Sequence, residues 1–273
     1  MKKQINYWYR KYIPNYLQNI LQLKFLKLFI NNIIRSLTYL KFEKTIQSKA
    51  RNAGISYYAS NDDDPATLFN NLIERVCNWG ETASKLNLSA DTNLPGANLY
   101  NQYPGEHYRL LASIVKEEKP RLIIEIGTYT GMSSKVFLDF IDKDSRIITF
   151  DIIKWTKFNS YLNQKDFDSG RIVQEISDLS VDENFMRYEG FFKKAELIFM
   201  DAPKNGTFEI KFLENLSNLK FENRNRLLII DDIRVPEMFE AWRAIDSPKL
   251  DATTFGHWSG TGIVDISKGL TLK

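Results

Sequence analysis

The sequence predicts an α/β fold, with a seven-stranded, mainly parallel sheet covered by helices on both faces. Three observations support this prediction. After Pro104, short apolar runs alternate with segments of helical spacing; the first run leads into a glycine turn; and several runs end in acidic residues. Alternating strands and helices build a parallel sheet that binds ligands at the carboxyl ends of its strands. The 273 residues, 43% of them hydrophobic, suffice for one globular core and a small accessory region.

The first part of the chain, residues 1–55, is predicted to be a basic helical arm. Residues 1–51 hold eleven Lys and Arg against a single acid, Glu43. Within residues 15–42, apolar side chains recur at helical spacing and basic ones fall on the other side. Such a helix either lies on an anionic membrane surface or packs against the domain or a second copy of the chain. Charged residues interrupt every apolar run, so we expect a retained segment and not a cleaved signal.

Residues 56–104 are predicted to form a helical cap or linker. An Asp-rich stretch ending in Pro65 is typical of a helix start. An apolar stripe then runs from Leu68 to Trp79, and we expect the helix to stop at Gly80. The only cysteine, Cys77, excludes an intramolecular disulfide and favours a reducing, cytoplasmic location, with peripheral membrane contact through the arm as an option.

The remaining residues, 105–273, are predicted to be the catalytic domain. Segments 133–140 and 208–219 have helical spacing. The expected strands are Arg121–Ile126, Arg146–Asp151, Arg171–Ile176, Glu196–Asp201, Arg226–Asp231, Leu250–Phe255 and Thr261–Ile266.

The turn after the first strand indicates a cofactor site. Gly127 and Gly131 are spaced G-x-x-x-G behind an acid, Glu125, whereas a dinucleotide site needs G-x-G-x-x-G. Asp151 ends the second strand, where a carboxylate can accept two hydrogen bonds from a ribose diol. The alternative is that the glycines are ordinary turn residues and Asp151 a solvated strand end.

Three carboxylates are expected to meet at one edge of the sheet. Asp201 ends the fourth strand, and Asp231 and Asp232 end the fifth. If these strands are neighbours, the acids repel one another unless a cation lies between them, and hard oxygen ligands suit Mg²⁺ or Mn²⁺. The alternative is that the Asp doublet caps the following helix, with Arg234 and Glu237 as pairing partners.

These motifs resemble the class I S-adenosylmethionine-dependent methyltransferases, and within them the metal-dependent O-methyltransferases of the catechol and macrolide-sugar types. The resemblance covers about residues 105–245 and implies a Rossmann-like methyltransferase fold. It further implies a set of residues near S-adenosylmethionine: Gly127, Tyr129 and Ser133 at the methionine part, Asp151 at the ribose, Asp178 at the adenine edge, and Glu106 close by.

The resemblance also implies a chemical centre. Asp201, Asp231 and Asp232 match its metal ligands, and Lys204 matches the general base of the catechol enzymes. Those enzymes carry Asn at the position of Asp232, whereas the macrolide-sugar enzymes resemble the all-Asp set, so a catechol-like and a sugar hydroxyl both stay open as acceptors. His257, in a glycine-rich turn between the last two strands, is a second candidate base or a plain hairpin residue.

Two other functions are compatible with the sequence. A nucleic-acid methyltransferase would use the basic arm to contact phosphates, although the basic residues of the arm share a helix with long aliphatic residues and lack an obvious aromatic stacking platform on a strand. A non-catalytic membrane-surface scaffold would not need the glycine turn and the three acids. The sequence therefore favours O-methylation of a small molecule or sugar over these two functions. The protein is expected to be monomeric or a homo-oligomer.

Overall fold

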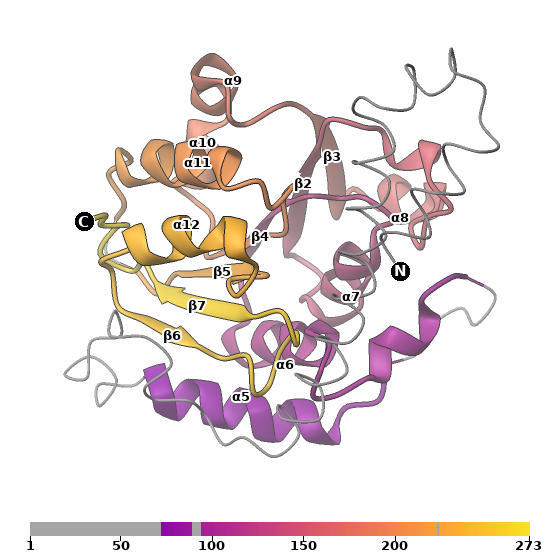
Figure 1. The fold of residues 1–273 in the computed structure, drawn as a ribbon. Helices are drawn as coiled ribbons and strands as arrows, with labels where there is room; N and C mark the ends of the chain where they lie inside the picture. The colour runs from indigo at the N-terminus through magenta and orange to yellow at the C-terminus, as the bar shows by residue number, and fades with distance from the viewer. Residues whose placement is uncertain (1–71, 89–93, 223) are drawn as a thin grey trace, which may run out of the picture. The chain divides into compact units, whose positions relative to one another are not determined.

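The computed structural model describes residues 72–88, 94–222 and 224–273. These residues contain a seven-stranded sheet in the order β3-β2-β1-β4-β5-β7-β6 (Figure 1). Strands β1 to β5 run parallel, and β7 runs antiparallel between β5 and β6. The predicted fold class, a Rossmann-like sheet of seven mainly parallel strands, is confirmed. The strands are β1 Leu122–Ile126, β2 Arg146–Asp151, β3 Ile172–Ile176, β4 Leu197–Met200, β5 Leu227–Asp231, β6 Lys249–Asp251 and β7 Thr261–Asp265.

Helices cover both faces of this sheet because successive side chains of each buried strand point to opposite sides. Ile123 of β1 packs in a core with α5, α6 and α7, while its neighbour Ile124 packs in a second core with α9 to α12 (Figure 1). The helices are α5 Ile73–Lys85, α6 Tyr108–Glu118, α7 Met132–Phe140, α8 Gln164–Asp168, α9 Asp182–Arg187, α10 Glu189–Phe192, α11 Thr207–Ser217 and α12 Phe239–Ala244, with short 3₁₀ turns η2 Ala97–Asn101, η3 Trp155–Lys157 and η4 Pro236–Met238.

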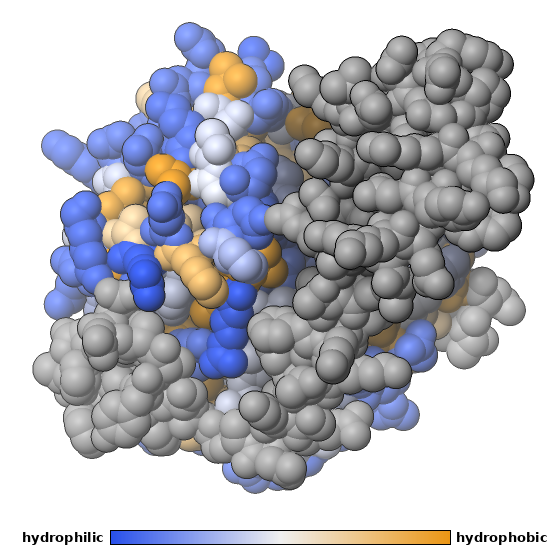
Figure 2. Space-filling view, viewed as in Figure 1, coloured by the Kyte–Doolittle hydropathy of each residue, from blue (hydrophilic) through white to orange (hydrophobic). Residues whose placement is uncertain are grey.

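The outer surface of the second helical layer faces water. Figure 2 shows a mainly hydrophilic face over α9, α11 and α12, with isolated hydrophobic residues. Apolar side chains such as Phe212 and Leu213 of α11 are instead fully buried against the sheet. The helices are thus amphipathic, as the spacing of their apolar residues predicts.

The helix expected to stop at Gly80 continues to Lys85, so that boundary was wrong. Ala83, one turn beyond the glycine, is fully buried and extends the apolar stripe. Gly80 itself serves packing: a Cβ there would lie 2.7 Å from the ring of Phe255. A glycine inside a helix lets another element approach closely, and that reason for its presence is not visible in the sequence.

The expected strand Leu250–Phe255 is also wrong at its carboxyl end, because β6 stops at Asp251. The side chain of Asp251 accepts hydrogen bonds from the backbone N–H of Thr253, at 3.0 Å, and from its hydroxyl. Such a local bond bends the chain into a turn and ends the ladder. This turn leads to the glycine-rich segment that carries His257.

The predictions for the arm fall outside the described residues, as do residues 56–71 of the cap region. The segment predicted to contact a membrane or a second copy, residues 15–42, therefore keeps the status of a prediction. Among the residues that the structure describes, no helix is long and apolar enough to span a membrane.

Candidate functional site

A pocket of about 810 Å³ opens at the carboxyl ends of β1 to β4, where the topology predicts a ligand. Its size is typical of a site for a small organic ligand. The lining combines backbone of the glycine turn, strand-end acids and an apolar rim: Ile126, Gly127, Tyr129, Phe150, Asp151, Ile152, Ile153, Phe158, Ser177, Asp178, Leu179, Ser180, Asp201, Ala202, Pro203, Asn205, Thr207, Phe208 and Lys211.

Gly127 makes the turn at the floor of this pocket. Its φ is +102°, and its N–H donates to the carbonyl of Phe150 at 2.8 Å. A Cβ at this position would lie 2.1 Å from the carbonyl oxygen of Asp201. The glycine is therefore required by the close approach of β1 and β4 as well as by its backbone conformation.

Gly127→Ala is expected to lower the free energy of unfolding by more than about 2 kcal/mol, because left-handed strain adds to a backbone clash. Gly170→Ala is the matched control: Gly170 also has positive φ, +70°, but nothing lies within 4 Å of its Cβ position. The control should cost about 1 kcal/mol. Urea denaturation of both variants makes the comparison. Equal losses would show that the contact with Asp201 is dispensable.

Glu125 shapes the turn from beneath. Its side chain is fully buried, and its carboxylate accepts hydrogen bonds from Ser133 at 2.5 Å, from Thr149 at 2.5 Å and from Ser134. Burial raises the pKa of Glu125 to about 7, although the three hydroxyl groups lower it. Glu125 and Ser133 were both predicted near the cofactor. They lie behind the loop and not among the residues lining the pocket, so the structure favours a role in shaping it.

The raised pKa of Glu125 predicts a pH-dependent stability. The folded protein holds this proton to about pH 7, whereas an exposed glutamate of the unfolded chain releases it near pH 4.5. The folded state binds more protons in this window, so the free energy of unfolding falls as pH rises through it, by up to about 3 kcal/mol. Glu125→Gln should flatten that part of the profile, measured by urea denaturation between pH 4.5 and 8. Superimposable profiles would contradict it.

Asp151 and Asp178 both line the pocket, and their contacts with a ribose and an adenine edge stay predictions. Asp151 Oδ2 accepts from the N–H of Tyr129 at 2.8 Å, and Oδ1 accepts from Ile153 at 2.9 Å. These bonds fix the carboxylate while each oxygen keeps a second lone pair. Asp178 is exposed and accepts from the N–H of Ser180 at 2.9 Å.

The rim beside Asp151 is apolar and exposed. Tyr129 is 64% exposed and Ile152 is 68% exposed. The ring of Tyr129 meets that of Phe158 edge to face, with centroids 4.9 Å apart. Exposed aromatic and aliphatic side chains around a polar centre are typical of a site that holds a flat heterocycle.

The three strand-end acids lie together because β4 and β5 are adjacent, which is the condition under which the acids were expected to meet. Oxygen atoms of Asp201, Asp231 and Asp232 lie within 4.8 Å of one another. Asp232 adopts positive φ, +62°, and its N–H donates to the carbonyl of Gly260 at 2.7 Å. Asp201 also lines the pocket, so the acid cluster forms part of its wall.

The capping alternative for the Asp doublet is not supported. The short helix η4 has Val235 at its N-cap position and no side-chain cap. Arg234 pairs instead with Asp251, at 2.8 Å. The side chains of Asp231 and Asp232 therefore do not cap the following helix.

Lys204 supplies a positive charge to the cluster. Its Nζ contacts Asp201 and lies 3.1 Å from Asp232 and 3.9 Å from Asp231. Burial alone would lower the pKa of Lys204, but the three carboxylates outweigh burial and raise it above its usual value. In this arrangement Lys204 is an ammonium counter-ion. The role of base stays a prediction and requires that another cation take over the carboxylates.

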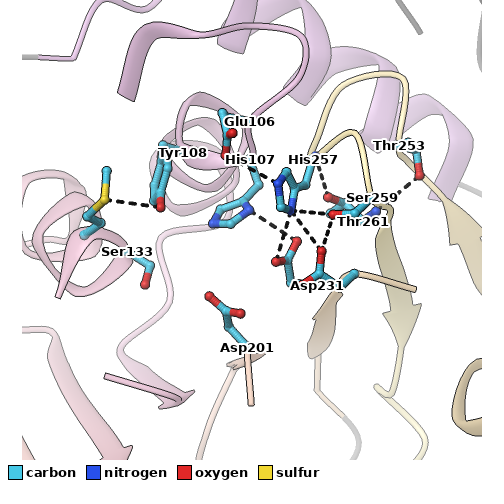
Figure 3. A network of polar contacts seen from close by, with 12 residues as sticks. Glu106, His107, Tyr108, Ser133, Asp201, Asp231, Thr253, His257, Ser259 and Thr261 are labelled. Atoms are coloured by element: carbon cyan, nitrogen blue, oxygen red, sulfur yellow. Dashed lines mark hydrogen bonds and ion pairs between the residues drawn. The ribbon is translucent and has the colours of Figure 1, made fainter. Parts of the chain in front are cut away.

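Two histidines flank Asp231 (Figure 3). His107 Nδ1 lies 3.2 Å from Asp231 Oδ1, and His257 Nδ1 lies 3.3 Å from Asp231 Oδ2. Burial lowers the pKa of each imidazole, but the carboxylate of Asp231 raises it by more, so both imidazoles have a raised pKa. The imidazoles in turn hold the pKa of Asp231 well below its usual range, although burial raises it. Glu106 lies 3.6 Å from His257 Nε2 and is not among the residues that line the pocket, and its place near the cofactor stays a prediction.

His107 is the functional candidate that sequence reasoning left without a role. It immediately precedes α6, far in sequence from the strands that carry the acids. The sequence held one signal that could have drawn attention to His107, namely that the chain has only two histidines. Folding brings both to the same carboxylate.

The donor set fits a divalent cation. Three carboxylates lie within reach of one ion, and Asp231 Oδ1 is buried without a hydrogen bond from any described residue. Acidic oxygens held this close are stabilised by a cation between them. The pocket likewise fits a nucleoside, because the carboxylate of Asp151 lies beside an apolar rim.

No protein-family model and no curated protein matches the sequence. Among solved structures, a methyltransferase from Geobacter sulfurreducens is 19% identical, and the match covers 71% of this chain and 96% of that one, with a TM-score of 0.45. SAH-bound PaMTH1 from Podospora anserina is 15% identical, covering 78% and 99%, with a TM-score of 0.41. MycE of the mycinamycin pathway, with Mg and SAH, is 14% identical, covering 57% of this chain and only 39% of MycE, with a TM-score of 0.35. Similarities of this size transfer neither activity nor substrate, so the function has to come from the chain's own residues.

Proposed function

We propose that this protein is an S-adenosylmethionine-dependent methyltransferase that methylates a hydroxyl group of a small molecule or sugar with the help of a divalent cation. The observation that carries the proposal is the position of Asp201. It belongs to the pocket that begins at the glycine turn and, at the same time, to the cluster of three carboxylates. A cofactor in that pocket and a cation in that cluster would therefore be immediate neighbours.

The cofactor half of the proposal depends on Asp151 and the glycine turn. Asp151 presents two fixed carboxylate oxygens to the pocket, the geometry that a ribose diol requires. The apolar rim of Tyr129, Ile152 and Phe158 offers a surface for an adenine ring. The turn at Gly127 leaves backbone at the end of the pocket nearest Asp201, where the methionine part and its sulfonium would lie.

The acceptor half depends on the acid cluster. Methyl transfer from a sulfonium to a hydroxyl is an in-line displacement, so the protein has to align the acceptor oxygen and remove its proton. A divalent cation held by Asp201, Asp231 and Asp232 would supply a Lewis acid that lowers the pKa of that hydroxyl. The chain's own contribution is to hold the carboxylates rigidly at two adjacent strand ends and to exclude water with the buried side chains of His107 and Glu106.

Charge balance favours the same interpretation. Four carboxyl groups, those of Glu106, Asp201, Asp231 and Asp232, face the single ammonium of Lys204 and two imidazoles. A cation bound by the carboxylates would lower the proton affinity of Lys204, so that the ammonium could release its proton to solvent and the neutral amine could then accept the proton of the acceptor hydroxyl, which is the role that the resemblance implies. No separate base is then needed.

The experiment is a methyl-transfer assay with S-adenosylmethionine and a panel of catechols, other phenols and sugars, with and without Mg²⁺ or Mn²⁺, together with calorimetry of cofactor binding. We expect cofactor binding without metal and transfer only with metal. No heat of binding for S-adenosylmethionine would reject the methyltransferase assignment, and undiminished transfer in excess chelator would reject the metal.

A further inference from the structure

His107 is a buried imidazole whose polar atoms are unsatisfied. Its side chain is 3% exposed, and neither ring nitrogen makes a well-directed hydrogen bond to a described residue. Asp231 Oδ1, at 3.2 Å from His107 Nδ1, is in the same condition. A buried polar group without a partner costs about 1–3 kcal/mol. His107 Nδ1 and Asp231 Oδ1 therefore face each other with lone pairs that one cation between them could use, provided that this imidazole is neutral.

A second imidazole faces the same carboxylate. His257 Nδ1 lies 3.3 Å from Asp231 Oδ2 and 2.8 Å from the hydroxyl oxygen of Ser259. One ligand atom from each of His107, Asp231 and His257 can be chosen so that all three lie within 4.8 Å of one another. Nitrogen and oxygen donors at bond lengths of about 2.1 Å around one ion have separations in this range.

Backbone contacts hold the two histidines in place independently of any ligand. The N–H of Gly105 donates to the carbonyl of Gly256 at 3.2 Å, and the N–H of Trp258 donates to the carbonyl of Gly105 at 3.0 Å. The N–H of His257 also donates to the hydroxyl oxygen of Thr261 at 2.8 Å. The segment before α6 and the turn before β7 therefore form one rigid support, as a preorganised site requires.

We propose that His107 and His257 are metal ligands together with Asp231, and that the ion bound here is consequently Mn²⁺ or a later first-row transition metal and not Mg²⁺. The proposal rests on the proposed function, because it concerns the same ion. Mg²⁺ takes oxygen ligands and keeps several waters, whereas imidazole suits transition metals. Asp231 belongs to this group and to the carboxylate cluster, so Asp201 and Asp232 would supply further oxygen ligands to the same ion.

The alternative is that the imidazoles are only charged partners of Asp231. In that case both are protonated and offer no lone pair to a metal. The two arrangements differ in one measurable property, which is direct bonding between an imidazole nitrogen and the ion.

The experiment uses the full chain without a histidine tag, so that its two histidines are the only imidazoles present. Mn²⁺ is added to the metal-free protein, and the electron spin-echo modulation of the bound ion is recorded for unlabelled protein and for protein labelled with ¹⁵N-histidine. We expect nitrogen coupling that changes frequency on labelling. His107→Gln and His257→Gln should each weaken Mn²⁺ binding at least about ten-fold. Because the wild-type spectrum alone decides whether imidazole binds the ion, misfolding of a variant does not compromise the test.

Two other outcomes overturn the proposal in distinguishable ways. Bound Mn²⁺ without nitrogen coupling, lost in Asp231→Asn, would mean a carboxylate-only site and leave the proposed function standing. No bound Mn²⁺ at all would overturn both this inference and the metal dependence of the proposed reaction.

Discussion

Asp231→Ala and Asp201→Ala are each expected to lower methyl transfer by about three orders of magnitude or more, while changing the affinity for S-adenosylmethionine less than about three-fold. A loss of that size corresponds to about 4 kcal/mol of transition-state stabilisation. It follows from removing a ligand of the proposed ion, which would orient the acceptor hydroxyl and lower its pKa. Turnover at saturating cofactor and calorimetry with cofactor alone separate the two effects.

The controls for this prediction have to address stability, because Asp231 is buried between two imidazoles. Asp231→Asn keeps the volume and one oxygen, and its melting temperature should show whether the fold survives. Asp232→Asn should be milder than either alanine variant, since an amide oxygen still ligates. Asp144→Ala changes an exposed loop acid outside the cluster and should leave turnover unchanged. Substantial activity in Asp201→Ala at wild-type metal concentration would contradict the metal-held arrangement.

The sheet was predictable because hydrophobic runs and helical stretches alternate so regularly from β1 to β5. In a buried parallel strand such as β4, Leu197–Met200, every residue is apolar, and this pattern stands out without tertiary information. The predicted ends of a helix and a strand were wrong where a single side-chain contact outside the local pattern decides where the element ends. The ring of Phe255 explains Gly80 within a helix, and the bonds of Asp251 to Thr253 end β6 early. Neither contact can be read from local periodicity.

The residues of the candidate site could also be predicted only in part from the sequence. Strand-end acids converge whenever their strands are neighbours, so Asp201, Asp231 and Asp232 could be grouped from the sequence alone. Glu125 and His107 could not be placed, because their roles depend on which side of a loop they occupy. Glu125 turned out to lie beneath the glycine turn with three hydroxyl donors. His107 reaches the acids only because the backbone of Gly105 pairs with the turn at His257.

The turn and the acid cluster are physically connected, which affects how the cofactor site should be tested. A Cβ on Gly127 would strike the carbonyl of Asp201, one of the expected metal ligands. A substitution at Gly127 therefore disturbs the fold, the cofactor pocket and the metal site together. Asp151 lines the same pocket from β2 and is not part of the acid cluster, so it is the better residue for isolating cofactor binding.

Asp151→Ala is expected to weaken binding of S-adenosylmethionine about a hundred-fold. The change would remove the two charge-assisted hydrogen bonds that we propose to the ribose, together worth about 3 kcal/mol. It also frees the N–H groups of Tyr129 and Ile153 that the carboxylate now holds. Asp151→Asn should bind the cofactor with an affinity between those of Asp151→Ala and the wild type, since it retains one acceptor oxygen. Asp178→Ala, at an exposed acid of the same pocket, should weaken cofactor binding less than ten-fold.

Calorimetric titration with metal-free protein measures cofactor binding alone, and Mn²⁺ affinity should be the same in all three variants and the wild type. If Asp151→Ala bound the cofactor as tightly as the wild type, the pocket at the glycine turn would not be the cofactor site, and the methyltransferase assignment would lose its main support.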